Sequence, residues 1–406
     1  MSPQLALGFD ATKACVDGSC RRCREDLAFL QRKRRPNPVN DRDPLRVVDL
    51  FAGCGAMSLG LAEGARRAGR AVALALAVDS QEEMIAAYAA NLAGAATEVA
   101  DVTSLFPGPV GAPLTADERA LAKKIGRVDL LLGGPPCQGH SDLNNHTRRR
   151  DPKNALYLRM ARAAEVLRPK LVIVENVVAV QHDERGVVDA TAEALRCTGY
   201  AVASRVIDLR LVGVPQRRRR HLLMASRLPH LDPASTLESL AKGAPGHPDR
   251  TVRWAIEDLM AVKDATIYDT VTTPSERNAR RIDHLFDNDV YNLPNRQRPE
   301  CHRDGGHTYV SMYGRLRWNE PAQTITTGFG SMGQGRYVHP ARRRTITPHE
   351  AARLQTFPDW YDFGDDILRT ALATMIGNAV PPLLMVALGQ QVIPLLPSEP
   401  PAHPPT

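Results

Sequence analysis

Two short stretches of the sequence each place a reactive side chain directly behind an apolar run. Cys137 stands in "GGPPCQGHS" after "VDLLL", and Glu175 stands in "ENV" after "KLVIV". A thiolate is a strong nucleophile, but a thiol in an apolar pocket stays protonated unless a base or a charge assists it. A carboxyl group on a neighbouring strand could handle that proton, so the pair predicts covalent catalysis. The alternatives are a small buried cysteine and a glutamate that caps a turn.

A third stretch, "VVDLFAGCGAMSLGL", is typical of a strand, a glycine turn and a helix. Gly53 and Gly55 would let a ligand approach the backbone, and a helix N-terminus favours a negative group. Asp79 ends the next strand, where its carboxylate could accept hydrogen bonds from a ribose or cap the following helix. Asp101 follows the third strand and could accept a hydrogen bond from the amine of adenine. Together these strand ends predict a cofactor that carries adenosine.

Arginine is concentrated in five blocks, in a chain whose formal net charge is +7. Guanidinium groups match the oxygens of phosphate, so the blocks favour a nucleic-acid partner. The alternative is a set of solvated faces and flexible arms. The blocks are Arg21–Arg24, Arg32–Arg35, Arg148–Arg150, Arg217–Arg220 and Arg342–Arg344.

The fourth of these blocks, "PQRRRR", follows a segment with the pattern of a strand. Alternate residues of an extended segment share one face, so Gln216, Arg218 and Arg220 would point the same way. They could orient Glu175, hold a phosphate or simply be solvated.

Apolar runs alternate with amphipathic helical patterns from Leu45 to Ser226, which predicts an α/β fold with a doubly wound, mostly parallel sheet. Ligands of such a sheet bind at the carboxyl ends of its strands. The periodicity fades between Leu228 and Thr308, which indicates a smaller irregular domain. We expect a basic N-terminal arm over residues 1–44, a catalytic domain over 45–227, the small domain over 228–308, a return to the catalytic domain over 309–390 and a proline-rich tail over 391–406.

The cysteines suggest a reducing compartment. There are seven of them, an odd number, with no secretory signal and no apolar run long enough to cross a membrane, so we expect a cytoplasmic protein. Cys15, Cys20 and Cys23 have some look of a zinc knuckle, but a fourth ligand is missing nearby. We therefore predict no metal and a basic, partly mobile arm with incidental thiols, and a zinc site is the alternative interpretation.

In this order the motifs resemble those of the C5-specific DNA cytosine methyltransferases. The matching blocks are "DLFAGCGA", "GGPPCQGHS", "ENV", "PQRRRR", "RTITPHEAARLQTFPD" and "GNAVPP". The resemblance extends from about Leu45 to Leu388, apart from the variable segment. It implies the fold of the class I methyltransferases that depend on S-adenosylmethionine, with residues 228–308 as a target recognition domain.

The resemblance also implies roles for individual residues. Cys137 would be the nucleophile, Glu175 would contact the cytosine ring, and Arg218 and Arg220 would support them. Phe51 would stack on the adenine of S-adenosylmethionine, and Asp79 would hold its ribose. The other residues implied to bind this cofactor are Gly53, Gly55, Asp101, Val102, Pro136, Leu156, Asn378 and Val380.

The implied reaction explains these residue types. Attack of the Cys137 thiolate on carbon 6 of a flipped-out cytosine makes carbon 5 nucleophilic, and Glu175 assists at ring nitrogen 3. Three positions depart from the family pattern without removing a necessary group. His140 stands where phenylalanine is common, Ala56 where a third glycine is common, and Asp79 where glutamate is usual.

Three other functions were weighed against the DNA enzyme. A tRNA cytosine methyltransferase of the same fold would carry the tripeptide "CFT", which does not occur here. A catalytically silent DNA-binding relative would not need Cys137, Glu175, Gln216 and Arg218. A nucleotide-dependent oxidoreductase shares only the first motif. We therefore expect a monomeric, sequence-specific enzyme acting on double-stranded DNA, whose methylation would protect host DNA from a separate restriction or phage-defence protein.

Overall fold

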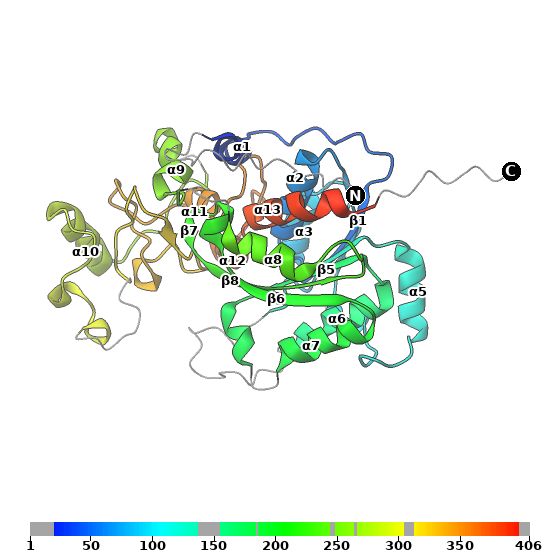
Figure 1. Ribbon diagram of the computed structural model, residues 1–406. Helices are drawn as coiled ribbons and strands as arrows, with labels where there is room; N and C mark the ends of the chain where they lie inside the picture. The colour runs from blue at the N-terminus through cyan, green and yellow to red at the C-terminus, as the bar shows by residue number, and fades with distance from the viewer. Residues whose placement is uncertain are drawn as a thin grey trace.

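A seven-stranded sheet runs through the centre of the protein (Figure 1). The computed structural model describes residues 20–136, 155–183, 186–243, 248–263, 266–303 and 312–397. Its strands lie in the order β3–β2–β1–β4–β5–β8–β6. β1 to β5 pair in parallel, whereas β8 runs antiparallel to both β5 and β6. The bounds are β1 Leu45–Leu50, β2 Val72–Asp79, β3 Thr97–Val99, β4 Leu130–Gly133, β5 Leu171–Asn176, β6 Ala201–Asp208 and β8 Arg219–Ser226.

Helices cover both faces of this sheet, as the alternation of patterns predicted (Figure 1). One face packs against α2 Ala56–Arg67, α3 Glu82–Asn91, α8 Pro233–Lys242, α12 Arg369–Asn378 and α13 Pro382–Val392. The other packs against α4 Val102–Leu105, α5 Ala116–Ile125, α6 Ala155–Leu167 and α7 Val187–Cys197. Successive strand residues point to opposite faces. Ile173 accordingly belongs to the first core, and Val172 and Val174 belong to the second.

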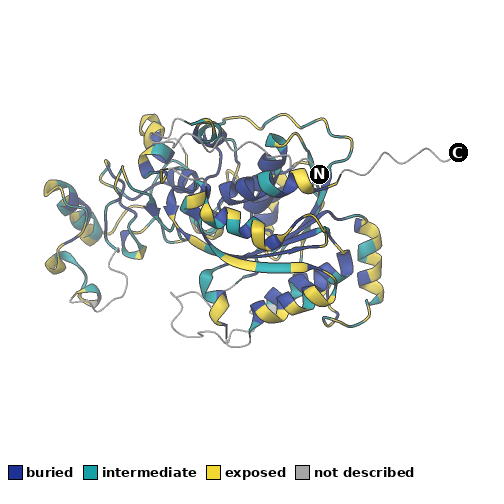
Figure 2. Cartoon of the chain, viewed as in Figure 1, coloured by how far each residue is buried: buried dark blue, intermediate teal, exposed yellow. Residues whose placement is uncertain are grey.

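The central strands position the predicted functional residues. β1, β4 and β5 are almost wholly buried, because both of their faces are covered by helices (Figure 2). β1, β2, β4 and β5 end at Leu50, Asp79, Gly133 and Asn176, which lie along one edge of the sheet. The glycine turn, the first acidic residue and the two reactive motifs therefore meet there.

A smaller, irregular region that includes α10 Glu276–Asp287 lies beside the sheet, whereas α9 Val252–Ile256 and α11 Pro348–Leu354 contribute to the main core (Figure 1). Its own core is small and consists of five buried residues, namely Ile282, Leu285, Leu293, Met332 and Val338. The pair β7 Gln216–Arg217 and β9 Ala322–Gln323 runs in parallel between this region and the sheet.

Packing differs from the expected domain limits at both ends of the recognition segment. We expected the small domain to begin near residue 228, but α8 packs against β6 and β8 and contributes Leu237 and Leu240 to the main core. We expected the catalytic domain to resume at residue 309; Leu316 and Ile325 join the main core, whereas Met332 and Val338 belong to the small core. The chain after residue 309 therefore contributes to both cores.

The N-terminal segment was expected to be an arm, yet from Arg21 to Leu30 it forms the helix α1, which packs on the fold. Phe29 and Leu30 are fully buried in the main core. Buried Asp26 forms ion pairs with Arg67 of α2 and Arg250, both at 2.5 Å. Arg67 and Arg250 are therefore paired with the internal carboxylate of Asp26 rather than free to bind phosphate.

Cys20 caps helix α1, and Cys23 lies within it. Cys20 Sγ accepts a hydrogen bond from the backbone N–H of Cys23 at 3.4 Å, and Cys23 itself is buried. Within the described ranges no three His, Cys, Asp or Glu side chains are grouped closely enough to hold a metal ion. Cys15 lies outside the described residues.

One stretch, Arg369–Leu395, is long and apolar enough to cross a membrane by length and composition, which we had not expected. Of its most apolar window, 72% is buried inside the protein. This burial is what core helices show, and α13 lies directly against α2.

Candidate active site

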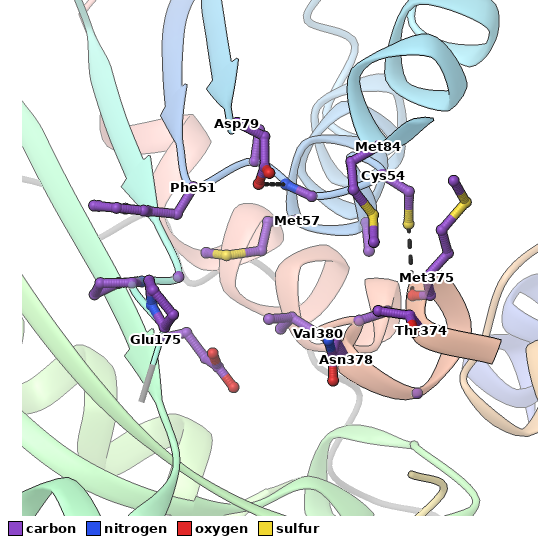
Figure 3. A pocket seen from close by; sticks show the side chains of 18 of the residues that line it. Phe51, Cys54, Met57, Asp79, Met84, Glu175, Thr374, Met375, Asn378 and Val380 are labelled. Atoms are coloured by element: carbon purple, nitrogen blue, oxygen red, sulfur yellow. Dashed lines mark hydrogen bonds between the residues drawn. The ribbon is translucent and has the colours of Figure 1, made fainter. Parts of the chain in front are cut away.

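A pocket of about 630 Å³ opens at the carboxyl edge of the sheet (Figure 3). This size is within the ordinary range for a small-molecule site. The predicted cofactor residues that line it are Phe51, Gly53, Asp79, Asp101, Val102, Pro136, Leu156, Asn378 and Val380. Glu175, Arg218 and Arg220 line the same pocket. The structure therefore brings together both predicted groups of residues, and Cys137 lies outside the described residues, next to Pro136.

The turn after β1 is tied to the end of β2. Phe51 and Gly53 both have positive φ angles, +56° and +52°, which glycine adopts readily but phenylalanine does not. Asp79 Oδ2 accepts the backbone N–H of Gly53 at 2.9 Å, and Oδ1 accepts that of Gln81 at 3.0 Å (Figure 3). Asp79 therefore fixes the turn and the start of α3 before any ligand arrives.

The two glycines of the turn have different functions. A Cβ atom on Gly53 would meet no atom within 4 Å, so its open side belongs to the pocket wall. Gly55, which was predicted to line the cofactor site, does not line the pocket. A Cβ atom there would lie 2.8 Å from side-chain atoms of Tyr88 and Leu92, at a φ of +88°. Gly55 is required for packing between α2 and α3.

Asp101 both caps a helix and lines the pocket. Its Oδ1 accepts the backbone N–H and the hydroxyl of Thr103, both at 2.8 Å, and so caps α4. Asp101 is nevertheless exposed and lines the pocket beside Val102. The cap orients the carboxylate, so the two roles are compatible.

Glu175, the penultimate residue of β5, forms an ion pair with Arg220 of β8, with 2.7 Å between Oε1 and Nε. Burial raises the pKa of Glu175 above its ordinary value, while the positive charges of Arg220 and Arg218 oppose that rise. A raised pKa favours the protonated form of this carboxyl group, which is the form that can donate to a substrate.

Arg218 differs from the expectation that both arginines would support Glu175 directly. Its guanidinium is 2% exposed and donates to the backbone carbonyls of Ile325 and Ala379, at 2.9 and 3.1 Å. Its charge still acts on Glu175 through space. Because residues 216 and 218 point the same way, the extended segment aims Arg218 inward beside Gln216, as predicted.

Strand β4 and the residues after it, which lead to Cys137, contact β5 and α6. Asn176 Nδ2 donates to the carbonyl of Pro135 at 3.2 Å, so the "ENV" and "GGPPC" motifs are joined directly. A Cβ atom on Gly133 would lie 2.4 Å from the sulfur of Met160, so this glycine lets α6 pack against β4.

Sequence reasoning missed two groups of pocket residues. Thr324–Thr327 line it from the chain that returns after the recognition segment. Its sulfur-bearing wall consists of Cys54, Met57, Met84 and Met375 (Figure 3). The repeated threonines of "TITT" could have indicated an extended segment, but nothing in the sequence indicates where that segment lies.

Comparisons with known proteins agree with this geometry. The model of the C-5 cytosine-specific DNA methylase family matches residues 45–394. The chain belongs to this family. The type II methyltransferase M1.BsuMI of Bacillus subtilis (strain 168) is 42% identical over 363 residues, which cover 89% of this chain and 84% of the relative.

More distant relatives extend the comparison. The type II methylase M.HgiDII of Herpetosiphon aurantiacus is 33% identical over 281 residues, 65% of this chain and 74% of the relative. Among solved structures, the Dnmt2 methyltransferase of S. pombe has a TM-score of 0.56 at 16% identity, over 86% of this chain and 99% of that one. The predicted fold class is confirmed.

Membership in the cytosine-C5 methylase family establishes the enzyme class. The chain is a DNA (cytosine-5-)-methyltransferase, and S-adenosylmethionine is the methyl donor of such methyltransferases. The oxidoreductase alternative fails, since it shares only the glycine turn. The pocket also fits the donor in chemistry, because it offers an aromatic ring, two oriented carboxylates and an open glycine at the strand ends.

Proposed function

We propose that this methyltransferase transfers a methyl group from S-adenosylmethionine to carbon 5 of a flipped-out cytosine within a specific duplex sequence, through a covalent Cys137 adduct. The observation that carries the proposal is the shared pocket, which is lined both by Asp79 and Asp101 and by the Glu175–Arg220 pair. A methyl donor and a target base in one pocket would be within reach of each other.

On the cofactor side, this chain supplies contacts that are already oriented. Asp79 would accept hydrogen bonds from the ribose hydroxyls, and Asp101 from the adenine amine. Phe51 would stack on the adenine, and Gly53 would let the ligand approach the backbone. When bound, S-adenosylmethionine supplies an electrophilic methyl group on a sulfonium.

On the base side, the cysteine and the glutamate would act in sequence. The Cys137 thiolate would add to carbon 6 of cytosine, and Glu175 would donate a proton or hydrogen bond at nitrogen 3, so that charge does not build up on the ring. The electron pair then reaches carbon 5, which takes the methyl group. Loss of the proton from carbon 5 and expulsion of the thiolate restore the ring. Arg220 would hold Glu175 in place throughout.

The target base must leave the helix, which costs a few kcal/mol of stacking and pairing. Arginines on the recognition segment would offset that cost through phosphate or guanine contacts. Arg296, Arg298 and Arg303 are the candidates, and Arg296 and Arg303 are exposed. Arg298 donates to the carbonyl of Leu293 at 3.1 Å, which orients its side chain.

Bisulfite sequencing of plasmid DNA from cells that express the protein tests this function. We expect cytosines within one short motif to be protected, and Cys137→Ser to abolish that protection. A chain that protects no cytosine in duplex DNA, or protects it equally without the thiol, would overturn the proposal. RNA would be the next substrate to test.

For the biological role, we infer that methylation protects host DNA from a separate restriction or defence protein. The relatives M1.BsuMI and M.HgiDII are type II methyltransferases. Deletion of the gene should make the DNA sensitive to a nuclease that cuts the same motif. An unchanged sensitivity to every nuclease of the host would argue against the role. We expect a monomer in the cytoplasm.

A further inference from the structure

Three buried side chains beneath the pocket form a closed ring of hydrogen bonds with two backbone groups. Gln216 donates through Nε2 to Gln355 Oε1 at 2.9 Å, and Gln355 donates through Nε2 to the Ala379 carbonyl at 3.3 Å. Arg218 donates to that same carbonyl and to the carbonyl of Ile325. The N–H of Ile325 donates back to Gln216 Oε1 at 2.9 Å. We call these five residues the junction ring.

The junction ring is isolated from water. Gln216, Gln355 and Ile325 are 0% exposed, and Arg218 is 2% exposed. Buried polar groups are costly unless they are satisfied, so each bond in such a ring constrains the others. Both polar groups of the Ile325 backbone are held by side chains of one extended segment, which fixes the position and the orientation of that peptide.

The two backbone groups belong to two different segments of the pocket lining, one of which we assign to DNA and the other to the cofactor. Ile325 lies within Thr324–Thr327, which lines the pocket from the recognition segment. Ala379 lies between Asn378 and Val380, which line it on the proposed cofactor side.

The two segments also touch directly. A Cβ atom on Gly377 would lie 2.3 Å from the backbone nitrogen of Thr327 and 2.5 Å from the carbonyl carbon of Thr326. A shift of either segment would therefore be transmitted to the other through packing and through the ring.

We propose that the junction ring couples the two sides of the pocket, so that cofactor bound against Asn378 and Val380 positions the Thr324–Thr327 segment for DNA. Arg218 and Gln355 are then positioning residues, which act through Ile325 and Ala379. This inference rests on the proposed function, because it assigns the two sides to cofactor and DNA. Coupling between sites is reciprocal and amounts to about 5- to 150-fold in affinity in typical proteins.

The test measures how much the cofactor product strengthens DNA binding. The Kd of a duplex that carries the methylated motif is measured with and without saturating S-adenosylhomocysteine, and the ratio is the coupling factor. We expect a factor of at least about fivefold for the wild-type chain. For Gln355→Met, whose side chain does not line the pocket, we expect the factor to fall close to one. The affinity for each ligand alone should change by less than about threefold.

Glu320→Gln is the matched control. Glu320 pairs with Arg217 at 2.9 Å and so links the chain just before Thr324 to the segment that carries Gln216 and Arg218, but on the exposed side and outside the ring. We expect this variant to keep the wild-type coupling factor. Arg218→Lys retains the charge but can reach only one of the two carbonyls, so its factor should be intermediate. It carries the test if Gln355→Met proves too unstable to bind either ligand.

A folded Gln355→Met or Arg218→Lys chain with the wild-type coupling factor would overturn the inference, and so would a wild-type factor of one. Failure of the proposed function would be distinguishable. In that case the wild-type chain would protect no motif in the bisulfite experiment, whatever the coupling factor between S-adenosylhomocysteine and plasmid DNA.

Discussion

The two sides of the pocket are built in different ways. The proposed cofactor side takes its carboxylates from consecutive strand ends, where backbone groups hold them, as Gly53 holds Asp79, and it takes Asn378 and Val380 from a distant part of the chain. The proposed base side gathers Glu175, Arg220 and Thr324–Thr327 from distant parts of the chain, through an ion pair and the junction ring. Contacts near the strand ends thus orient the carboxylates of the first side, whereas long-range contacts position the second. Changes on one side should therefore leave different signatures from changes on the other.

The largest difference between the effects on catalysis and on cofactor binding is expected for Glu175→Gln. The amide keeps the size of the side chain but removes the titrating group and weakens the contact with Arg220. We expect kcat to fall by about 10²- to 10⁴-fold, as for loss of a general acid or base. The affinity for S-adenosylhomocysteine, measured by calorimetry, should stay within about twofold. An equal loss of cofactor affinity would show that the two sides are not separable in this way.

The second prediction concerns Asp49, a buried carboxyl group of β1 that differs from Glu175 in its surroundings. Burial raises the pKa of Asp49 to about 7, and its one hydrogen bond among the described residues comes from the hydroxyl of Ser58 at 2.6 Å. Glu175, in contrast, has two arginines beside it.

The folded chain therefore holds a proton on Asp49 that the unfolded chain loses above about pH 4. The free energy of unfolding should decrease between pH 4 and about 7 by up to a few kcal/mol through this group alone. Asn at this position cannot titrate, so Asp49→Asn should remove that part of the decrease. Denaturant titrations at several pH values check this, and parallel profiles for the two chains would contradict it.

Asp79→Asn should affect the cofactor side alone. An amide oxygen can accept one backbone N–H, but it loses the charge that favours ribose hydroxyls. Hydrogen bonds to charged groups contribute about 1.5–3 kcal/mol, so we expect the KM for S-adenosylmethionine to rise by about 10- to 100-fold. At saturating cofactor, kcat should be close to that of the wild-type chain. A fall in kcat without a change in KM would place Asp79 on the base side instead.

The smallest effects come from a matched pair of glycine changes. Both positions have positive φ, which costs an alanine about 1–2 kcal/mol. Gly55→Ala adds a clash with Tyr88 and Leu92, so thermal unfolding should show the larger loss of stability there. Gly53→Ala places its methyl group in open space at the pocket wall, so it should mainly weaken cofactor binding. Identical profiles for the two variants would show that the glycines are equivalent.

The same contrast explains what could be predicted from the sequence. Strand–turn–helix patterns placed Phe51, Gly53, Asp79 and Asp101 at one edge of a doubly wound sheet, because each lies at or just after the carboxyl end of a strand. The alternation of Gln216 and Arg218 predicted a shared face, and the structure turns that face inward. In each case a short stretch of chain determines the geometry, and the structure agrees.

Contacts that depend on the path of the whole chain could not be predicted. Gln355 reaches Gln216 across 139 residues, and Thr324–Thr327 reach the pocket only after the recognition segment. The arginine blocks were interpreted from composition, which cannot distinguish a phosphate contact from an internal ion pair. Arg32, which pairs with buried Glu63, and Arg344, which pairs with buried Glu350, form such internal pairs.

Helix α1 has a consequence for how the protein folds. Its Asp26 pairs with Arg250, 224 residues further along the chain, and the carbonyl of Leu30 accepts the N–H of Asp359 at 2.9 Å. Contacts between such distant residues slow folding, because a long loop must close before they form. During synthesis, α1 emerges well before Arg250 and Asp359, so it cannot complete its contacts until those residues have been made. We therefore expect α1 to dock in a late step, and Asp26 to be among the last acidic groups to become protected from solvent.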